Sequence, residues 1–152
     1  GVKFVLHHFV PHEDPAHRGL AQLMPATRRS MLGSMLLANP ALLEPILGME
    51  IKCPQEQIGT VAGILSGKRG KLLNVEQKGV ISIIQGEVPA SETFDLSEVM
   101  RGGTAGKALW NTYFKTWQVV PQSIFQTIVN DIRKRKGLNP EPPNPDEFVD
   151  KE

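Results

Sequence analysis

The sequence has one cysteine, Cys53, and no apolar run that approaches the roughly 18 residues required by a membrane-spanning helix. A single thiol cannot form a disulfide within the chain, so the composition favours the reducing cytoplasm. The opening GVKFVLHHFVPH is not typical of a signal peptide, because histidines interrupt its apolar part and no small-residue cleavage site follows. We therefore expect a cytoplasmic protein with no membrane segment.

Net charge is nearly absent as well, at +1 over 152 residues. The balance conceals an asymmetry, because residues 139–152 hold five acidic residues and one lysine. The other residues are basic overall, with clusters at 28–29, 68–71 and 133–136. A basic body of this kind is typical of proteins that meet polyanions. The alternative is that these lysines and arginines only solvate exposed faces.

Periodicity predicts an α+β fold for residues 46–120. Strand-like alternation over 47–51 precedes an amphipathic helix, and two strands, a short helix and a final β-rich run follow. This β-α-β-β-α-β order is that of ferredoxin-like domains, which have a four-stranded antiparallel sheet with both helices on one face. Residues that begin and end these elements can also be predicted. Pro54 is expected at the start of the first helix, and Gly67 and Gly70 at its end. Lys78-Gly79 is expected to form the turn between strands, Asp95 or Ser97 to cap the second helix, and Gly102-Gly103 to end it.

The remaining segments flank this domain. Residues 2–10 have apolar side chains on both faces, which predicts an interior strand, and a helix is expected from Pro25 to Asn39-Pro40. A final helix over about 123–136, ended by Gly137, precedes a proline-rich acidic tail that we expect to be disordered. One strand and one helix cannot bury themselves, so the first forty residues either pack on the second unit or belong to a fragment of a larger protein. The start at Gly1, directly before a strand, favours a fragment.

Several chemistries lack the residues they need. The Gly-Lys stretches at 63–70 and 102–109 have three rather than four residues between glycines and no hydroxyl after lysine, so neither is a P-loop. His7, His8, His12 and His17 invite a metal-site interpretation, but adjacent strand residues face opposite ways and no metal-ligand spacing supports it. Cys53 has no histidine nearby in the sequence, so a buried inert thiol is the simpler interpretation.

The loop HEDPAHRGLAQ, residues 12–22, remains as the candidate site. Pro15 restricts Asp14 to extended geometry and Gly19 permits a sharp turn, so His17-Arg18 is predicted near the apex of a protrusion. An imidazole and a guanidinium there, followed by Arg28 and Arg29, suit contact with phosphates and bases. The alternative is a solvated loop with no partner.

At this loop the chain resembles a known family. HEDPAHRGLAQLMPATRRSML is similar to the domain IV tip of archaeal and eukaryotic elongation factor 2, the translocation GTPase. LLEPILGMEIKCPQEQIGTVAGILSGKRGKLL and EVPASETFDLSEVMRGGTAGKALWNTYFKTWQVVP resemble its domain V, and the acidic DPAHRG style looks archaeal. The resemblance implies half of domain IV at 1–43, a partial ribosomal-protein-like strand-loop-helix unit; domain V at 44–121; and the terminal helix and tail at 122–152.

The resemblance also implies a function. The tip would enter the decoding region and hold the tRNA–mRNA duplex during translocation, with contacts to tRNA and rRNA from His12, His17, Arg18, Gln22, Arg28 and Arg29. By its place in the HRG motif, His17 would be converted to diphthamide by dedicated synthesis enzymes and would be the target of ADP-ribosylating toxins. Leu20-Ala21 replaces glycines of many eukaryotic members, which puts recognition by those enzymes in doubt. Lys68, Arg69 and Lys71 are weaker candidates for contact with rRNA near the factor-binding centre.

GTP and Mg²⁺ would bind a G domain that this chain lacks, so we expect a monomeric, cytoplasmic, non-enzymatic part of a GTPase, with no cofactor or metal of its own. Two other hypotheses remain. A free-standing RNA- or protein-binding ferredoxin-like module would need a packed first forty residues, whereas exposed Val2, Phe4 or Leu6 would favour the fragment. A small histidine-based metalloenzyme would contain a bound transition metal.

Overall fold

The computed structural model describes residues 1–149, and the chain forms two compact units. One unit is Leu42–Pro121, and the other joins Gly1–Ala41 to the carboxyl-terminal segment that starts at Gln122. The terminal helix therefore groups with the amino-terminal segment.

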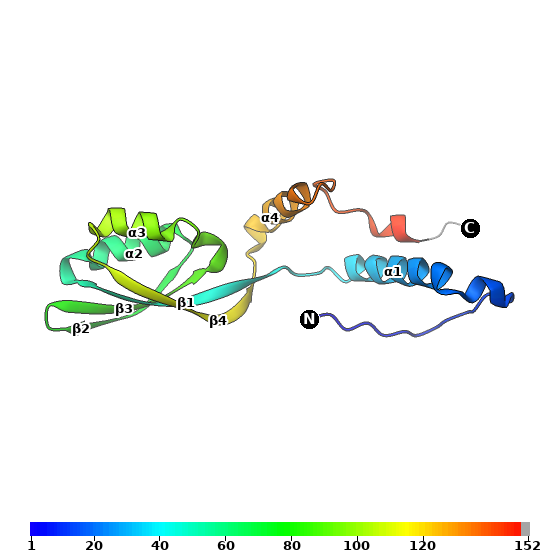
Figure 1. The fold of residues 1–152 in the computed structure, drawn as a ribbon, viewed down its shortest axis with the longest axis horizontal. Helices are drawn as coiled ribbons and strands as arrows, with labels where there is room; N and C mark the ends of the chain where they lie inside the picture. Colours follow the sequence, from blue (N-terminus) through cyan, green and yellow to red (C-terminus); the bar gives the residue numbers. More distant parts are fainter. Residues whose placement is uncertain (150–152) are drawn as a thin grey trace. The chain divides into compact units, whose positions relative to one another are not determined.

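The 42–121 unit has the predicted ferredoxin-like fold, with α2 and α3 covering one face of the sheet (Figure 1). Its antiparallel strands lie in the order β2-β3-β1-β4, so β1 is central and pairs with β3 and β4. Its elements are β1 Leu43–Pro54, η2 Gln55–Gln57, α2 Ile58–Gly67, β2 Lys71–Lys78, β3 Ile81–Pro89, η3 Ala90–Glu92, α3 Leu96–Thr104 and β4 Leu109–Val119.

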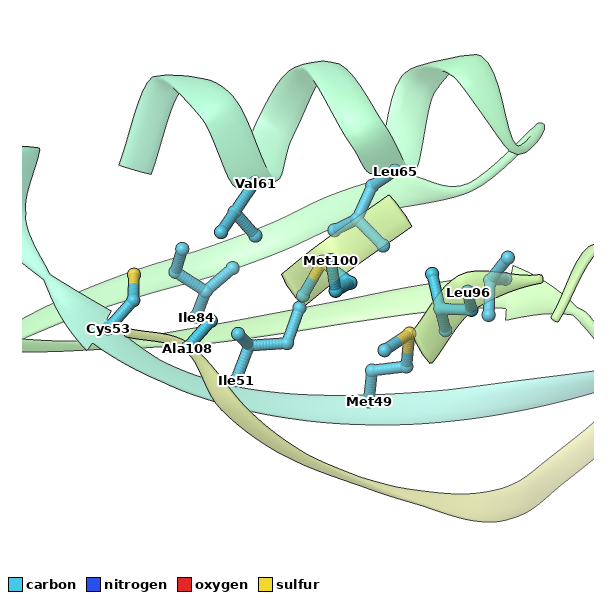
Figure 2. Close-up of a cluster of buried hydrophobic side chains, with 10 residues drawn as sticks. Met49, Ile51, Cys53, Val61, Leu65, Ile84, Leu96, Met100 and Ala108 are labelled. Carbon is cyan, nitrogen blue, oxygen red and sulfur yellow. The ribbon is translucent and has the colours of Figure 1, made fainter. Parts of the chain in front are cut away.

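The core of this unit lies between the sheet and the two helices. Met49, Ile51 and Cys53 alternate along β1 and point toward the helices, where Val61 and Leu65 of α2 meet them (Figure 2). These five side chains are all at most 1% exposed. Each large apolar side chain buried in this way contributes roughly 1.5–3 kcal/mol to folding. The alternation in β1 is therefore what holds the sheet to its helices.

The first crossover helix ends where the glycines predicted, but with an unexpected residue in the turn. Helix α2 ends at Gly67, and it is Arg69 that adopts the left-handed conformation, at φ +52°. Gly70 donates its N–H to the Leu65 carbonyl at 2.8 Å, and a Cβ on Gly70 would lie 2.8 Å from that oxygen. Gly70 is thus required for close approach rather than for a positive φ.

Two details of the predicted α3 were wrong. The helix continues through Gly102-Gly103 to Thr104 and ends at Ala105, which has φ +50°. Gly103 is a packing position, because a Cβ there would come within 2.9 Å of the Ile64 side chain of α2. Asp95 occupies the N-cap position, but its side chain makes no capping hydrogen bond and pairs with Lys68 instead.

Residues 2–10 do not form the predicted strand. The segment is extended beside α1 (Figure 1), yet it has no ladder partner among residues 1–149. A strand requires a neighbouring strand to receive its backbone hydrogen bonds. The large apolar side chains on both faces are exposed, from 44% at Phe4 to 80% at Leu6. The sequence therefore has the pattern of an interior strand without the partners.

Helix α1, Leu20–Leu37, begins five residues before the predicted start at Pro25. The Gly19 carbonyl accepts the N–H groups of Gln22 and Leu23, so the first turn forms without a side-chain cap. Pro25 lies inside the helix, where its ring removes one hydrogen bond. The helix tolerates this loss near its start, because the preceding turn is already closed.

Helix α4, Gln122–Arg135, matches the predicted terminal helix, and Gly137 follows it at φ +68°. The tail was predicted to be disordered, but its described part contains a short helix, η4 Pro145–Phe148. Asn144 begins η4 with a capping box that Glu147 completes. The tail packs on α1, where the Phe148 Cβ lies 3.1 Å from the position a Cβ would take on Gly33. Residues 150–152 lie outside the described part.

Candidate nucleic-acid interface

The tip loop, which we define as residues 12–19, joins the extended segment to α1. Its centre is the short helix η1, Pro15–Arg18, capped by Asp14, whose Oδ1 accepts the Ala16 N–H at 2.9 Å. The Asp-Pro pair suits this role, because an acceptor at N-cap and a proline at N1 both favour a helix start. All residues of the loop are exposed.

His17 lies on the last turn of η1, and its side chain is 57% exposed. Its ring contacts that of His12, with the two centroids 4.6 Å apart and the planes tilted by 50°. The Nδ1 atom of His17 lies 3.4 Å from the carboxylate of Asp14. The structure therefore places the His17 side chain in contact with solvent, as the sequence predicted.

Arg18 is turned back toward its own loop. Its Nε donates to the His12 carbonyl at 2.6 Å, and its Nη2 donates to the Glu13 carbonyl at 2.8 Å. The positive charge remains at the tip, because both acceptors are neutral and the residue is exposed. Gly19 has an ordinary φ of −72°, so the chain direction changes here without the positive φ that glycine would permit. A Cβ there would instead lie 3.0 Å from the Gln22 Oε1.

The other predicted tip residues lie on α1. Gln22 is in its first turn, whereas Arg28 and Arg29 are six and seven residues farther along. At 1.5 Å per residue, this separates them from Gln22 by roughly 9–10 Å along the axis. Arg29 also donates to the Glu147 carbonyl of the tail at 3.2 Å. The structure thus brings His12, His17 and Arg18 together and places the two arginines apart from them.

Arg69, in the other unit, is the centre of an ion-pair network. Its Nη1 and Nη2 donate to both oxygens of Glu44 at 2.9 Å, and its Nε donates to Glu92 at 2.7 Å. The hydrogen bonds that Arg69 donates to Glu44, above all, raise the pKa of Arg69. Glu44 is only 9% exposed, so this pair is a structural tie between the start of β1 and the turn after α2.

The two lysines beside Arg69 differ in their surroundings. Lys68 donates to both oxygens of Asp95, and only 19% of its side chain is exposed. Lys71 has a side chain that is 69% exposed, with its amine 3.9 Å from Glu87. Of these three predicted rRNA contacts, Lys71 is therefore the most accessible.

Sequence reasoning missed the roles of Asp14 and Glu44. The Asp14-Pro15 pair was interpreted only as extended backbone, although the same pair is a signal for a capped helix start. Glu44 lies at the start of the apolar strand β1 and carried no signal of its partner 25 residues later. Long-range ion pairs of this kind leave no periodicity in a single sequence.

Among residues 1–149, the structure gives little support to a metal site, a reactive thiol or a membrane-spanning helix. No group of three histidine, cysteine or acidic side chains there could hold a metal ion. Cys53 is buried, and this burial raises the pKa of its thiol, which suits an inert side chain. Within the same residues no helix is long and apolar enough to cross a membrane.

Comparison with known proteins gives a consistent match. The sequence profile of the family described as the elongation factor G C-terminus matches residues 41–128. The chain is 57% identical over 150 residues to elongation factor 2 of Cenarchaeum symbiosum, and 50% identical over 149 residues to that of Staphylothermus marinus. These alignments cover 99% and 98% of this chain. The chain spans about 20% of the length of either relative.

A solved structure of a protein from Thermus thermophilus is also similar. It is 35% identical, with a TM-score of 0.60, over 64% of this chain and 15% of the other. This solved structure thus resembles the chain in both fold and sequence.

Proposed function

Because the chain belongs to the family of the elongation factor G C-terminus, we propose that it is the ribosome-binding end of an elongation factor 2. In this proposal the tip loop contacts the tRNA–mRNA duplex in the decoding region while the factor moves tRNA and message. The observation that carries it is an exposed loop in which two imidazoles and a guanidinium lie together. Such groups donate to phosphates and base edges.

The proposed division assigns residues 1–43 to domain IV, 44–121 to domain V and 122–152 to the terminal helix and tail. The exposed apolar side chains of residues 2–10 support it, since a free-standing module would cover them. GTP hydrolysis belongs, in this proposal, to the G domain of the longer factor. The factor would act as a monomer in the cytoplasm.

His17 is the proposed site of diphthamide formation and of ADP-ribosylation. Its exposure supports access by modifying enzymes, which must reach the ring. An unmodified histidine is mostly neutral near pH 7, whereas diphthamide would add a fixed positive charge. The modification would therefore keep the tip cationic when it meets nucleic acid.

Contact between the 42–121 unit and rRNA is a separate part of the proposal. Lys71 is the candidate that the geometry favours, because its amine is exposed and its nearest carboxylate is 3.9 Å away. Lys68 and Arg69 are weaker candidates for contact with rRNA, since carboxylates already bind them.

A translocation assay tests the proposal. In the full-length factor, His17→Ala is expected to slow single-round movement of peptidyl-tRNA by at least about tenfold, equivalent to roughly 1.4 kcal/mol in the barrier. GTP hydrolysis on the ribosome should persist, because the G domain is untouched. Glu98→Ala, which changes an exposed residue on α3 of the 42–121 unit, is the control. Equal rates for the two variants would refute a role for the tip.

A further inference from the structure

The guanidinium of Arg18 closes the tip loop. Its two hydrogen bonds reach the carbonyl oxygens of His12 and Glu13, on consecutive residues six and five positions upstream. A planar guanidinium holds its donors in a fixed fork, so one side chain can hold two neighbouring acceptors at once. Lysine has the same charge but is a point donor on a flexible stem, so it cannot reproduce this geometry.

The closed loop fixes the partners of His17. His12 Nδ1 accepts the Asp14 N–H at 3.0 Å, so the His12 ring is tied to the backbone. The same ring lies against His17, whose other neighbour is the Asp14 carboxylate. The backbone N–H of His17 in turn donates to the Asp14 carbonyl at 3.1 Å. The ring of His17 therefore lies near the His12 ring and the Asp14 carboxylate, and Arg18 binds the backbone of the same segment at His12 and Glu13.

We propose that Arg18 is a positioning residue, which acts through His17 by holding the tip loop closed, rather than chiefly a ligand of phosphate. A loop that is already ordered loses less conformational freedom on binding, so closure favours affinity without adding a contact. This inference rests on the proposed function in one respect, that His17 is the group that meets the partner.

The two roles predict different behaviour for Arg18→Lys. If Arg18 chiefly binds a phosphate, lysine keeps the charge, so the salt dependence of binding and the ring contact between His12 and His17 both remain. If Arg18 is the positioning residue, lysine opens the loop, and binding weakens although the charge is kept. Arg101→Lys is the matched control, because Arg101 is exposed on α3 of the 42–121 unit, outside the tip loop.

The experiment combines histidine NMR with ribosome binding. In the unmodified protein, the ring contact at 4.6 Å should give a nuclear Overhauser effect between His12 and His17. Arg18→Lys should abolish this effect and weaken binding to archaeal ribosomes by about fivefold at an unchanged salt slope. Arg101→Lys should change neither the ring contact nor the affinity.

Three results would overturn the inference, and they separate its failure from that of the proposed function. A ring contact that survives Arg18→Lys shows that lysine suffices. A lost contact with normal ribosome binding, while His17→Ala binds weakly, shows that positioning is unimportant although the tip functions. Normal binding by both Arg18→Lys and His17→Ala removes the proposed function along with the inference.

Discussion

Residues 42–121 bury a cluster of ten side chains between sheet and helices, whereas in the other unit Gly33 is the only buried residue among 1–41 and 122–149. The contrast does not come from a shortage of apolar residues, since Phe4, Leu6 and Phe9 lie in one short segment. It comes from whether the strands have neighbours to pair with. The β-α-β-β-α-β order supplies every strand with a neighbour, and residues 2–10 have none within the described part.

The two regions are held by different kinds of interaction. The sheet-and-helix unit is held by long-range packing, and the tip loop by short-range hydrogen bonds among residues 12–18. Such local closure shapes a loop without burying it, so its functional side chains stay accessible.

Core truncation should separate the two units most strongly. Ile51→Ala removes a fully buried side chain from β1, and we expect it to lower the free energy of unfolding of the 42–121 unit by about 3 kcal/mol. Leu6→Ala, at a side chain that is 80% exposed, should change it by less than about 0.5 kcal/mol. Denaturant unfolding followed by tryptophan fluorescence measures both, and equal losses would remove the distinction.

The Arg69 network should give the next largest effect. Arg69→Met leaves the Glu44 carboxylate nearly buried without its bidentate partner. We expect a loss of about 2–3 kcal/mol, lower than for a fully buried pair because 27% of the Arg69 side chain is exposed. Lys52→Met, which removes an exposed pair with Glu50, should cost under about 1 kcal/mol. If the two substitutions cost the same, the network is not a structural tie.

Docking of the tail should respond to a smaller change. Gly33→Val puts a side chain where Phe148 lies, 3.1 Å from the Cβ position. We expect it to release residues 144–149 from α1, at a cost of about 1 kcal/mol, and to speed proteolysis of the tail. Gly63→Val is the control, because nothing lies within 4 Å of its Cβ position. Unchanged proteolysis in Gly33→Val would show that Phe148 does not depend on this glycine.

Acid titration should give the smallest effect. The hydrogen bond from Lys68 lowers the pKa of Asp95 below its ordinary 3.8. A carboxyl group whose pKa is lower in the folded state than in the unfolded state stabilises the fold at a pH above its unfolded-state pKa. This stabilisation is lost as the pH falls through its folded-state pKa. Lys68→Gln should therefore raise the pKa of Asp95 toward 3.8, as measured by NMR titration. An unmoved pKa would mean that Lys68 does not hold the carboxylate.

Local patterns predicted the 42–121 unit well, because apolar alternation marks strands and an apolar stripe marks helices in its sequence. Alternation in β1 and the stripe in α2 are visible in the sequence, and both reappear in the core. Glycines were less informative. Gly102 and Gly103 were interpreted as a helix stop, but helix α3 continues through both of them. Gly103 is needed instead because it lets α2 approach closely.

The position of the tip loop could be predicted from its residues, but its conformation could not. The sequence placed His17 and Arg18 at an exposed apex and implied that the arginine faces outward. The two carbonyls that Arg18 binds are backbone groups, which every residue has, so composition cannot reveal them. The structure of the tail was missed for a similar reason, since proline-rich acidic sequences suggest disorder while the fit of Phe148 on Gly33 depends on tertiary contact.

The most direct measurement is cross-linking from the tip. A photoreactive amino acid in place of Ala16, beside His17 in the full-length factor, reports what the loop touches on translocating ribosomes. The account predicts cross-links to tRNA, to messenger RNA or to rRNA of the decoding region. Cross-links confined to the factor itself, or to ribosomal sites remote from decoding, would contradict it.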